Sequence, residues 1–307
     1  MNATASRRSR IYRWISALAW LLWLLAAPQA AWAGEILLVA EDSVATRAFA
    51  DTLGQRRPQE RVRFVALDAA PAPDRLAADV RVITLGEKAL RWRLHSEAGP
   101  PTLVLLVSRI QAQPLLGDRR PRTLSLLWSD APLERQLRLI KHLLPNVTRI
   151  GLPHSAQAAF LLPEARQAAA KLQLSIVARE WADPRDTDTL KQVLLSSDVL
   201  LGIDDPAIYN AATAKSLLLT SYAKGRPLVG PTAAFVKAGS LTTSYSDQQD
   251  WLDTLDELLD RPSSTWPRTL YPSRFKVVGN RQVARSLGIR LIDERLAAQS
   301  LAEGERR

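Results

Sequence analysis

Polar residues follow several apolar runs of this sequence at the point where each run ends. Runs at 35–40, 80–85, 103–107 and 199–203 predict strands that are buried on both faces. The residues that follow are Glu41-Asp42-Ser43, Gly86-Glu87, Ser108-Arg109, Asp204-Asp205-Pro206 and, after a shorter run, Pro231-Thr232. Open α/β sheets bind their ligands beyond the carboxyl ends of the strands. Five polar strand ends facing one crevice therefore indicate a site for a small molecule.

Each of these strand ends also has a purely structural interpretation. Ser43 is a residue type that caps a helix starting at Val44, Gly86 suits a tight turn, and Asp205 before Pro206 fits an N-cap with proline at the first helical position. The two interpretations are compatible, because free N–H groups at helix N-termini bind anions and carboxylates. A ligand amine would instead pair with Asp204 or Asp205.

Recognised catalytic motifs are absent from the sequence. It has no GxxxxGK[ST] phosphate loop, no GxGxxG, no GxSxG elbow and no HExxH pair. Cysteine is absent, which removes thiolate catalysis and zinc–thiolate sites, and the three histidines (His95, His142 and His154) have no metal-ligand spacing. We therefore predict no catalytic residues, no metal ligands and no cofactor.

Strands that are apolar throughout alternate with amphipathic helical segments. The predicted strands are 35–40, 62–67, 80–85, 103–107, 124–128, 149–152, 174–178, 199–203, 228–230, 240–245 and 275–278. The predicted helices are 44–54, 87–95, 133–144, 156–172, 187–195, 207–224, 251–259 and 281–288. This order indicates parallel strands covered on both faces. Two successive series predict an α/β protein with two Rossmann-like lobes, and a single barrel of eight units is the weaker alternative.

The first 33 residues have the pattern of a cleavable secretory signal. Arginines at positions 7, 8, 10 and 13 precede an apolar run at 15–27, and Ala31-Trp32-Ala33 places small residues before Gly34. The run is shorter than the roughly 20 residues that span a bilayer, and the absence of cysteine excludes a lipid-anchored form. We expect cleavage before Gly34, general secretion, and a mature protein without a membrane anchor.

The charge pattern argues against nucleic acid as a partner. The formal net charge is +10, and the signal segment holds four of the arginines. The other basic residues are scattered, as at Arg56-Arg57, Arg119-Arg120 and Arg306-Arg307, with no interleaved aromatic residues. A nucleic-acid-binding surface would gather its charges on one element.

Two long stretches, Val199–Asp247 and Tyr271–Ile289, resemble the ABC-transporter substrate-binding protein family whose better-known members take aromatic or other amino acids. The most specific motifs are DPxxYN at 205–210, FVKAG at 235–239 and NRQVARSLG at 280–288. Weaker similarity at 82–92 and 133–152 extends the resemblance over most of residues 34–307. It implies the type I periplasmic binding protein fold, in which three crossovers join two α/β lobes.

On that pattern, lobe 1 is 34–125 plus 246–274, lobe 2 is 126–245 plus 275–300, and 301–307 is a C-terminal tail. The resemblance implies a ligand between the lobes and closure by hinge movement. The implied ligand-binding residues are Ser43, Thr84, Gly86, Ser108, Asp204, Asp205, Tyr209, Thr232 and Phe235. Tyr209 or Phe235 would stack on a planar group, and the helix N-termini at Ser43 and Gly86 would take an anionic one. Residues 108–122 depart from the pattern of the amino-acid-binding relatives, so the resemblance does not imply that the ligand is an amino acid.

The implied function is that of a periplasmic solute-binding component of an ABC importer. It would pass a small polar ligand to an inner-membrane permease and would not be an enzyme. Two alternatives remain: a stand-alone periplasmic sensor or partner protein without its own permease, and an exported α/β enzyme. A pull-down that recovers a receptor or kinase and no permease would favour the sensor or partner protein. A nucleophile–base set or a metal-ligand cluster would favour the enzyme.

Overall fold

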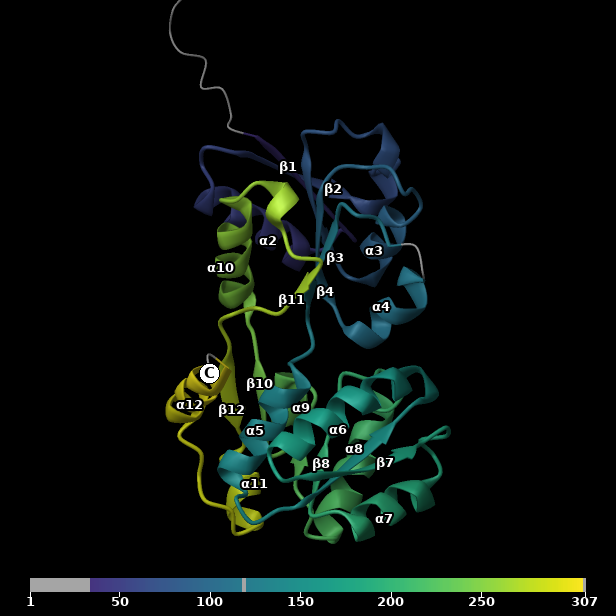
Figure 1. The fold of residues 1–307 in the computed structure, drawn as a ribbon, viewed down its shortest axis with the longest axis vertical. Helices are drawn as coiled ribbons and strands as arrows, with labels where there is room; N and C mark the ends of the chain where they lie inside the picture. The colour runs from purple at the N-terminus through teal and green to yellow at the C-terminus, as the bar shows by residue number, and fades with distance from the viewer. Residues whose placement is uncertain (1–33, 118–119, 306–307) are drawn as a thin grey trace, which may run out of the picture.

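The computed structural model describes residues 34–117 and 120–305, so the signal peptide expected at 1–33 lies outside the described residues. Two α/β lobes are stacked along the long axis of the molecule (Figure 1), and each is built on a six-stranded sheet. The strand order is β11-β5-β4-β3-β1-β2 in lobe 1 and β12-β10-β9-β8-β6-β7 in lobe 2. The predicted two-lobe α/β fold with parallel sheets is confirmed.

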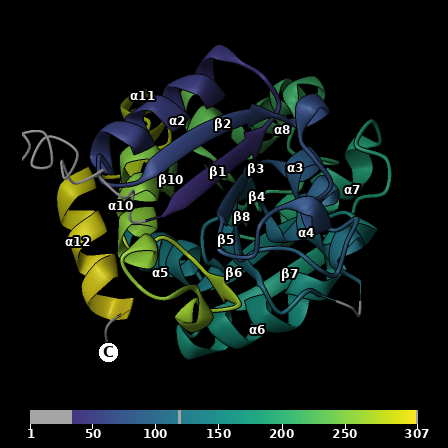
Figure 2. The same cartoon turned by 90° about the horizontal axis from the view of Figure 1, so that it is seen from above.

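The sheet of lobe 1 is parallel throughout and is covered by helices on both faces (Figure 2). Its strands are β1 (Glu35–Ala40), β2 (Arg61–Ala66), β3 (Arg81–Leu85), β4 (Thr102–Val107), β5 (Leu124–Trp128) and β11 (Thr269–Leu270). Its helices are α2 (Val44–Arg56), α3 (Glu87–Arg93), α4 (Arg109–Leu116) and α10 (Gln248–Leu259), with 3₁₀ turns η1 (Leu67–Ala69), η2 (Pro73–Arg75) and η4 (Ser263–Thr265). Helices α2 and α10 share one apolar core with the sheet, whereas α3 and α4 pack on the other face.

Lobe 2 repeats this layered arrangement, with one antiparallel strand pair at its edge. Its strands are β6 (Arg149–His154), β7 (Ser175–Glu180), β8 (Val199–Leu201), β9 (Leu228–Val229), β10 (Thr242–Tyr245) and β12 (Lys276–Gly279). Its helices are α5 (Leu133–Leu143), η3 (Ala156–Leu161), α6 (Leu162–Lys171), α7 (Thr187–Ser196), α8 (Ala211–Ala223), α9 (Ala233–Ala238), α11 (Arg281–Ser286) and α12 (Glu294–Glu305). Strands β10 and β12 run antiparallel, and the remaining pairs are parallel.

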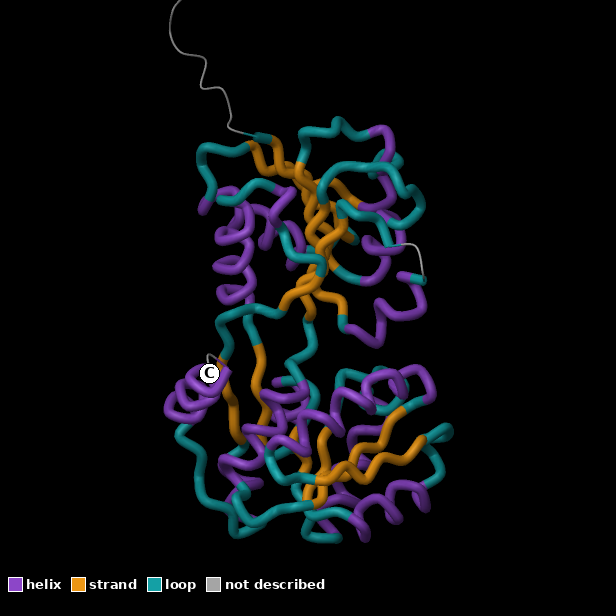
Figure 3. Tube along the Cα trace, in the orientation of Figure 1, coloured by secondary structure: helices purple, strands orange, loops and turns teal. Residues whose placement is uncertain are grey.

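The described chain passes between the lobes at three places, which Figure 3 shows as neighbouring loop segments. It leaves lobe 1 after β5, returns between β10 and α10, and passes from β11 to β12. Strands β5 and β10 both end at a crossing, and their parallel neighbours end at the same edges of the two sheets. The carboxyl ends of the two sheets therefore face each other across the junction.

Two lobe boundaries differ from those expected at 125 and 300. Strand β5 pairs with β4 up to Trp128, so its last residues belong to the sheet of lobe 1. Helix α12 continues to Glu305, and its Leu301 is buried in the cluster that also contains Val277 of lobe 2. Within the described ranges, no helix combines the length and the apolar character needed to cross a bilayer.

Candidate functional site

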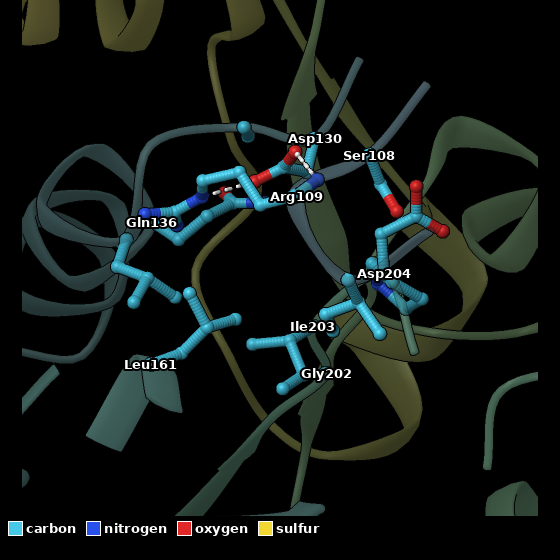
Figure 4. Close-up of a pocket in the computed structure, with 12 residues that line it drawn as sticks. Ser108, Arg109, Asp130, Gln136, Leu161, Gly202, Ile203 and Asp204 are labelled. Atoms are coloured by element: carbon cyan, nitrogen blue, oxygen red, sulfur yellow. Dashed lines mark hydrogen bonds and ion pairs between the residues drawn. The ribbon is translucent and has the colours of Figure 1, made fainter. Parts of the chain in front are cut away.

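A narrow recess lies between the two lobes, beside the first crossing of the chain (Figure 4). Its lining residues come from both lobes: Ser108, Arg109, Ile110, Asp130, Ala131, Leu133, Gln136, Leu161, Gly202, Ile203, Asp204 and Pro231. Its cavity volume is about 10 Å³, close to the least that one water molecule requires. The recess is thus too small for anything larger than a water molecule.

Arg109 is the most highly connected polar residue of this recess. Ser108 caps α4 by accepting from the Gln111 N–H, and the first helical residue, Arg109, follows directly. The Arg109 backbone N–H and Nε each donate to a carboxylate oxygen of Asp130 at 2.9 Å. The two side chains are 13% and 10% exposed. Burial opposes the charge of Arg109, yet the neighbouring carboxylates, Asp130 foremost, hold the pKa of its guanidinium above the ordinary value.

The same guanidinium reaches across to lobe 2. Its Nη1 donates to Oε2 of Glu164 on α6 at 2.5 Å, which makes an ion pair between the lobes. The ring of Tyr271, from the third crossing, lies 5.6 Å below the guanidinium carbon. Nη2 of Arg109 and the Tyr271 hydroxyl are buried without a hydrogen-bond partner in the described structure. Arg109 therefore links lobe 1, two crossings and lobe 2.

Asp204 supplies the second charged group of the recess, from lobe 2. It stands after β8 and lines the recess with Ser108, but it has no hydrogen-bond or ion-pair partner among the described residues. Burial raises the pKa of its carboxyl to about 6, and the negative charges of Asp130 and Asp205 add to this effect. A partly buried carboxylate without a counter-charge is unfavourable unless a ligand or solvent neutralises it.

The charges around the recess are unbalanced. The recess and its border hold three carboxyl groups, Asp130, Glu164 and Asp204, but one guanidinium, that of Arg109, which pairs with the first two. Asp204 has no cationic partner among the described residues. The excess negative charge at this point suits the amine or guanidine group of a ligand.

The structure places the other predicted acid, Asp205, inside lobe 2. It is 1% exposed, and its carboxylate accepts from the backbone N–H of Ser155 at 2.8 Å and of Ala207 at 3.1 Å. Its oxygens therefore hold the loops after β6 and β8 together. Of the adjacent acids, only Asp204 lines the recess, and contact of Asp205 with a ligand stays a prediction.

Tyr209 and Phe235 also lie in the core of lobe 2. Each is 8% exposed, and their rings pack edge to face with centroids 5.8 Å apart. Burial raises the pKa of the Tyr209 phenol, with Asp205 contributing. Each ring packs against the other in this structure, and stacking of either ring on a ligand stays a prediction.

Four further expected residues lie at strand ends but do not line the recess. Ser43 is exposed and caps α2 by accepting from the Thr46 N–H at 3.1 Å. Thr232 caps α9 in the same way, and Thr84 is fully buried in β3 with an unpartnered hydroxyl. Gly86 has φ +86°, and nothing lies within 4 Å of where a Cβ would stand, so the backbone there borders open space. Of the nine expected residues, the recess brings together Ser108 and Asp204.

Arg109, Asp130, Gln136 and Glu164 were not among the expected site residues. Gln136 lies on α5 and bonds through its amide to Thr243 and Ser244 of β10, which ties the first crossing to the second. Of the four, Arg109 had a visible signal, because it directly follows the strand-end Ser108. Among residues 34–117 and 120–305, no three His, Asp or Glu side chains gather in a way that could hold a metal ion.

The fold, with two largely parallel sheets facing each other across three crossings, is that of type I periplasmic binding proteins. Similar solved structures agree with this classification. A substrate-binding protein with adhesive properties from Clostridium difficile, in a ligand-free open structure, matches with a TM-score of 0.64 and 14% identity over 85% of this chain and 96% of its own. A protein from Streptococcus pneumonia, described as an ABC domain in complex with L-Trp, matches with a TM-score of 0.58 and 18% identity over 86% and 98%.

A conserved domain protein from Vibrio cholerae also matches, with a TM-score of 0.58 and 16% identity over 86% of this chain and 98% of its own. Comparison with protein-family models gives no match, and neither does a search of curated protein sequences. At these identities the solved structures establish the fold of the chain.

Proposed function

We propose that this protein is a solute-binding protein that captures a small organic cation between its two lobes. One observation carries the proposal: Asp204, a partly buried carboxyl with a pKa of about 6, faces a recess formed by both lobes and has no partner among the described residues. An ammonium group would supply the missing counter-charge. The solved structures that share this fold include substrate-binding proteins, which supports a binding role.

The protein has a positive net charge, which contrasts with the local excess of carboxyl groups at this recess. Residues 34–307 hold 37 Lys and Arg and 31 Asp and Glu, a net charge of +6, so the average surface attracts anions. A local excess of carboxyl groups in such a chain has to come from the placement of particular residues. The placement of Asp204 opposite the Arg109–Asp130 pair supports a cation as the ligand.

Capture requires the lobes to move. A recess of about 10 Å³ holds no more than a water molecule, so a larger ligand enters when the lobes separate. The three crossings are short segments between packed lobes, which is the usual form of a hinge. Closure then places the ligand in contact with Asp204 from lobe 2 and with the Ser108–Arg109 segment from lobe 1.

A thermal-shift screen of the purified protein tests this function. The probes are primary amines, guanidines, amino acids, small organic anions and neutral polyols, each at pH 7.5. We expect the cations to raise the melting temperature and Asp204→Asn to abolish the shift, whereas Asp188→Asn, which removes an exposed carboxylate on α7, leaves it unchanged. A shift with anions or polyols alone, or one that survives Asp204→Asn, contradicts the proposal.

We place this binding protein in the periplasm, as the component that delivers solute to an inner-membrane ABC permease. The signal pattern at 1–33 supports export, and the shared fold supports the role in transport. The mass of the protein recovered from the periplasm should correspond to a chain that begins at Gly34. Crosslinking in the presence of ligand should recover a permease, whereas recovery of a receptor or kinase would assign the protein to sensing.

A further inference from the structure

Leu106, at the end of β4, has a backbone conformation that leucine rarely adopts. Its φ is +57°, in the left-handed region that is unfavourable for a side chain larger than glycine, asparagine or aspartate. Among the described residues one other non-glycine has positive φ, Gln173, and it lies just past the end of α6, where this conformation is common. Leu106 has no such explanation, because it lies within a strand.

The strain at Leu106 coincides with a β-bulge. The register between β4 and β5 shifts between Val104 and Val107, so one residue is extra in β4. Val104 and Val107 both pack in the core beneath α3 and α4, and Leu106 is the residue that the bulge pushes out of the alternation. It is 45% exposed, while the other residues of β4 are buried.

Leucine at position 106 is not needed for the stability of the fold. An exposed leucine contributes little burial, and glycine or asparagine would adopt the same φ at a lower cost. Strained residues and bulges of this kind collect at functional sites, where they direct a side chain toward a ligand. The bulge therefore needs a reason outside the packing of lobe 1.

The surroundings of Leu106 supply that reason. It lies at the carboxyl end of β4, two residues before Ser108 and three before Arg109, both of which line the recess. The preceding carbonyl, that of Leu105, accepts from the N–H of Gly86, whose own position borders open space. Leu106 thus displays apolar surface on the edge of lobe 1 that faces lobe 2.

Lobe 2 shows an exposed apolar side chain on its facing edge as well. Phe160, in η3 after β6, is 40% exposed and directly precedes Leu161, which lines the recess. Exposed apolar residues therefore lie close to the ends of strands in both lobes, near a recess in which Asp204 has no counter-charge.

We propose that Leu106 is a specificity-determining residue, which contacts an apolar part of the ligand while Asp204 pairs with its cationic group. The inference rests on the proposed function and deepens it: the ligand is an organic cation with a hydrocarbon portion, and the bulge at β4 selects for that portion. Leu106 on lobe 1 and Asp204 on lobe 2 would then hold opposite ends of one molecule, so that only a ligand with both features favours closure.

Calorimetry with a homologous series of primary ammonium ions, from methyl- to hexylammonium chloride, tests this role. We expect the affinity of the wild-type protein to rise by about two- to fourfold for each added methylene. Leu106→Asn keeps a residue that tolerates positive φ but removes the apolar surface. It should flatten this dependence and leave methylammonium binding unchanged, with a melting temperature equal to or above that of the wild type.

Leu219→Asn is the matched control, because Leu219 is 59% exposed on α8 and does not line the recess. It should keep the full dependence on chain length. A wild-type series without that dependence, or one that Leu106→Asn leaves intact, overturns the role of Leu106 while the cation site stands. If no ammonium ion binds, or if binding survives Asp204→Asn, the proposed function fails and this inference fails with it.

Discussion

Arg109 of lobe 1 and Glu164 of lobe 2 form an ion pair of 2.5 Å that spans the junction of the lobes. The same guanidinium is fixed from behind by Asp130 of the first crossing. The two contacts differ in exposure, since Glu164 is 49% exposed and Asp130 is 10% exposed. One contact can therefore break when the lobes separate, while the other keeps Arg109 in place.

Because of this difference in exposure, substitution of Glu164 and of Arg109 should change the free energy of unfolding by unequal amounts. Glu164→Gln should change the free energy of unfolding by less than about 1 kcal/mol, because its carboxylate is half exposed. Arg109→Ala leaves the Asp130 carboxylate buried without a partner and should cost about 3–5 kcal/mol. Urea unfolding measures both values. Equal losses in the two variants would show that Asp130 is not buried as the structure has it.

Asp204 should make both ligand binding and stability depend on pH. Its pKa of about 6 lies above the unfolded value, so between about pH 4 and 6 the folded chain holds a proton that the unfolded chain releases. Stability attributable to this group therefore falls as the pH rises through that window, while affinity for a cation increases. Asp204→Asn should raise the free energy of unfolding at pH 7 by about 1–3 kcal/mol.

Calorimetry and urea unfolding of wild type and Asp204→Asn at pH 5 and 7.5 check these two trends. Asp188→Asn, which removes an exposed acid on α7, serves as the control and should follow the wild type in both. Cation binding that is equally strong at both pH values in the wild type would argue against Asp204 as the receptor.

Asp205 should behave unlike its neighbour. Asp205→Ala leaves the N–H groups of Ser155 and Ala207 without their acceptor and should reduce the free energy of unfolding by about 1–3 kcal/mol. The melting temperature falls, but a cation should still raise it from the new baseline. Loss of the ligand response with an unchanged melting temperature would instead support Asp205 as a ligand contact.

The C-terminal helix should contribute to lobe 2 through one face. Leu301 of α12 is 3% exposed against Leu139 and Val277, so Leu301→Ala should cost about 2–4 kcal/mol. Leu296, on the same helix and 53% exposed, provides the control, and its alanine variant should stay within about 0.5 kcal/mol. Similar unfolding curves for the two variants would mean that α12 does not pack on lobe 2 in solution.

The alternation of apolar runs and amphipathic segments was enough to predict most elements of both lobes, because buried parallel strands carry a strong local signal. Three helices and one strand were missed, among them the six-residue helix α9. Helix α4 contains Pro114, which normally argues against a helix, and β11 is two residues long. Helix α12 begins after the last motif of the family resemblance. The helix expected at 207–224 starts at 211, because Asn210 caps it with its side chain.

The site was less predictable than the fold for a physical reason. The rule that ligands bind at strand ends identified Ser108 and Asp204, but it applied equally to Ser43 and Thr232, which cap helices. Arg109 and Glu164 are 55 positions apart and meet only when the lobes are assembled. The sequence also could not distinguish the roles of Asp204 and Asp205, because the inward orientation of Asp205 depends on the N–H of Ser155, which belongs to another loop.

The passage of the chain back into lobe 1 sets an order for its folding. The core of that lobe includes Trp251, Leu255 and Trp266 of the late segment, and its edge strand β11 ends at Leu270. A chain made from its N-terminus therefore cannot complete its first lobe until almost nine-tenths of it has been synthesised. Until then the early strands have only part of the apolar core that they have in the finished lobe.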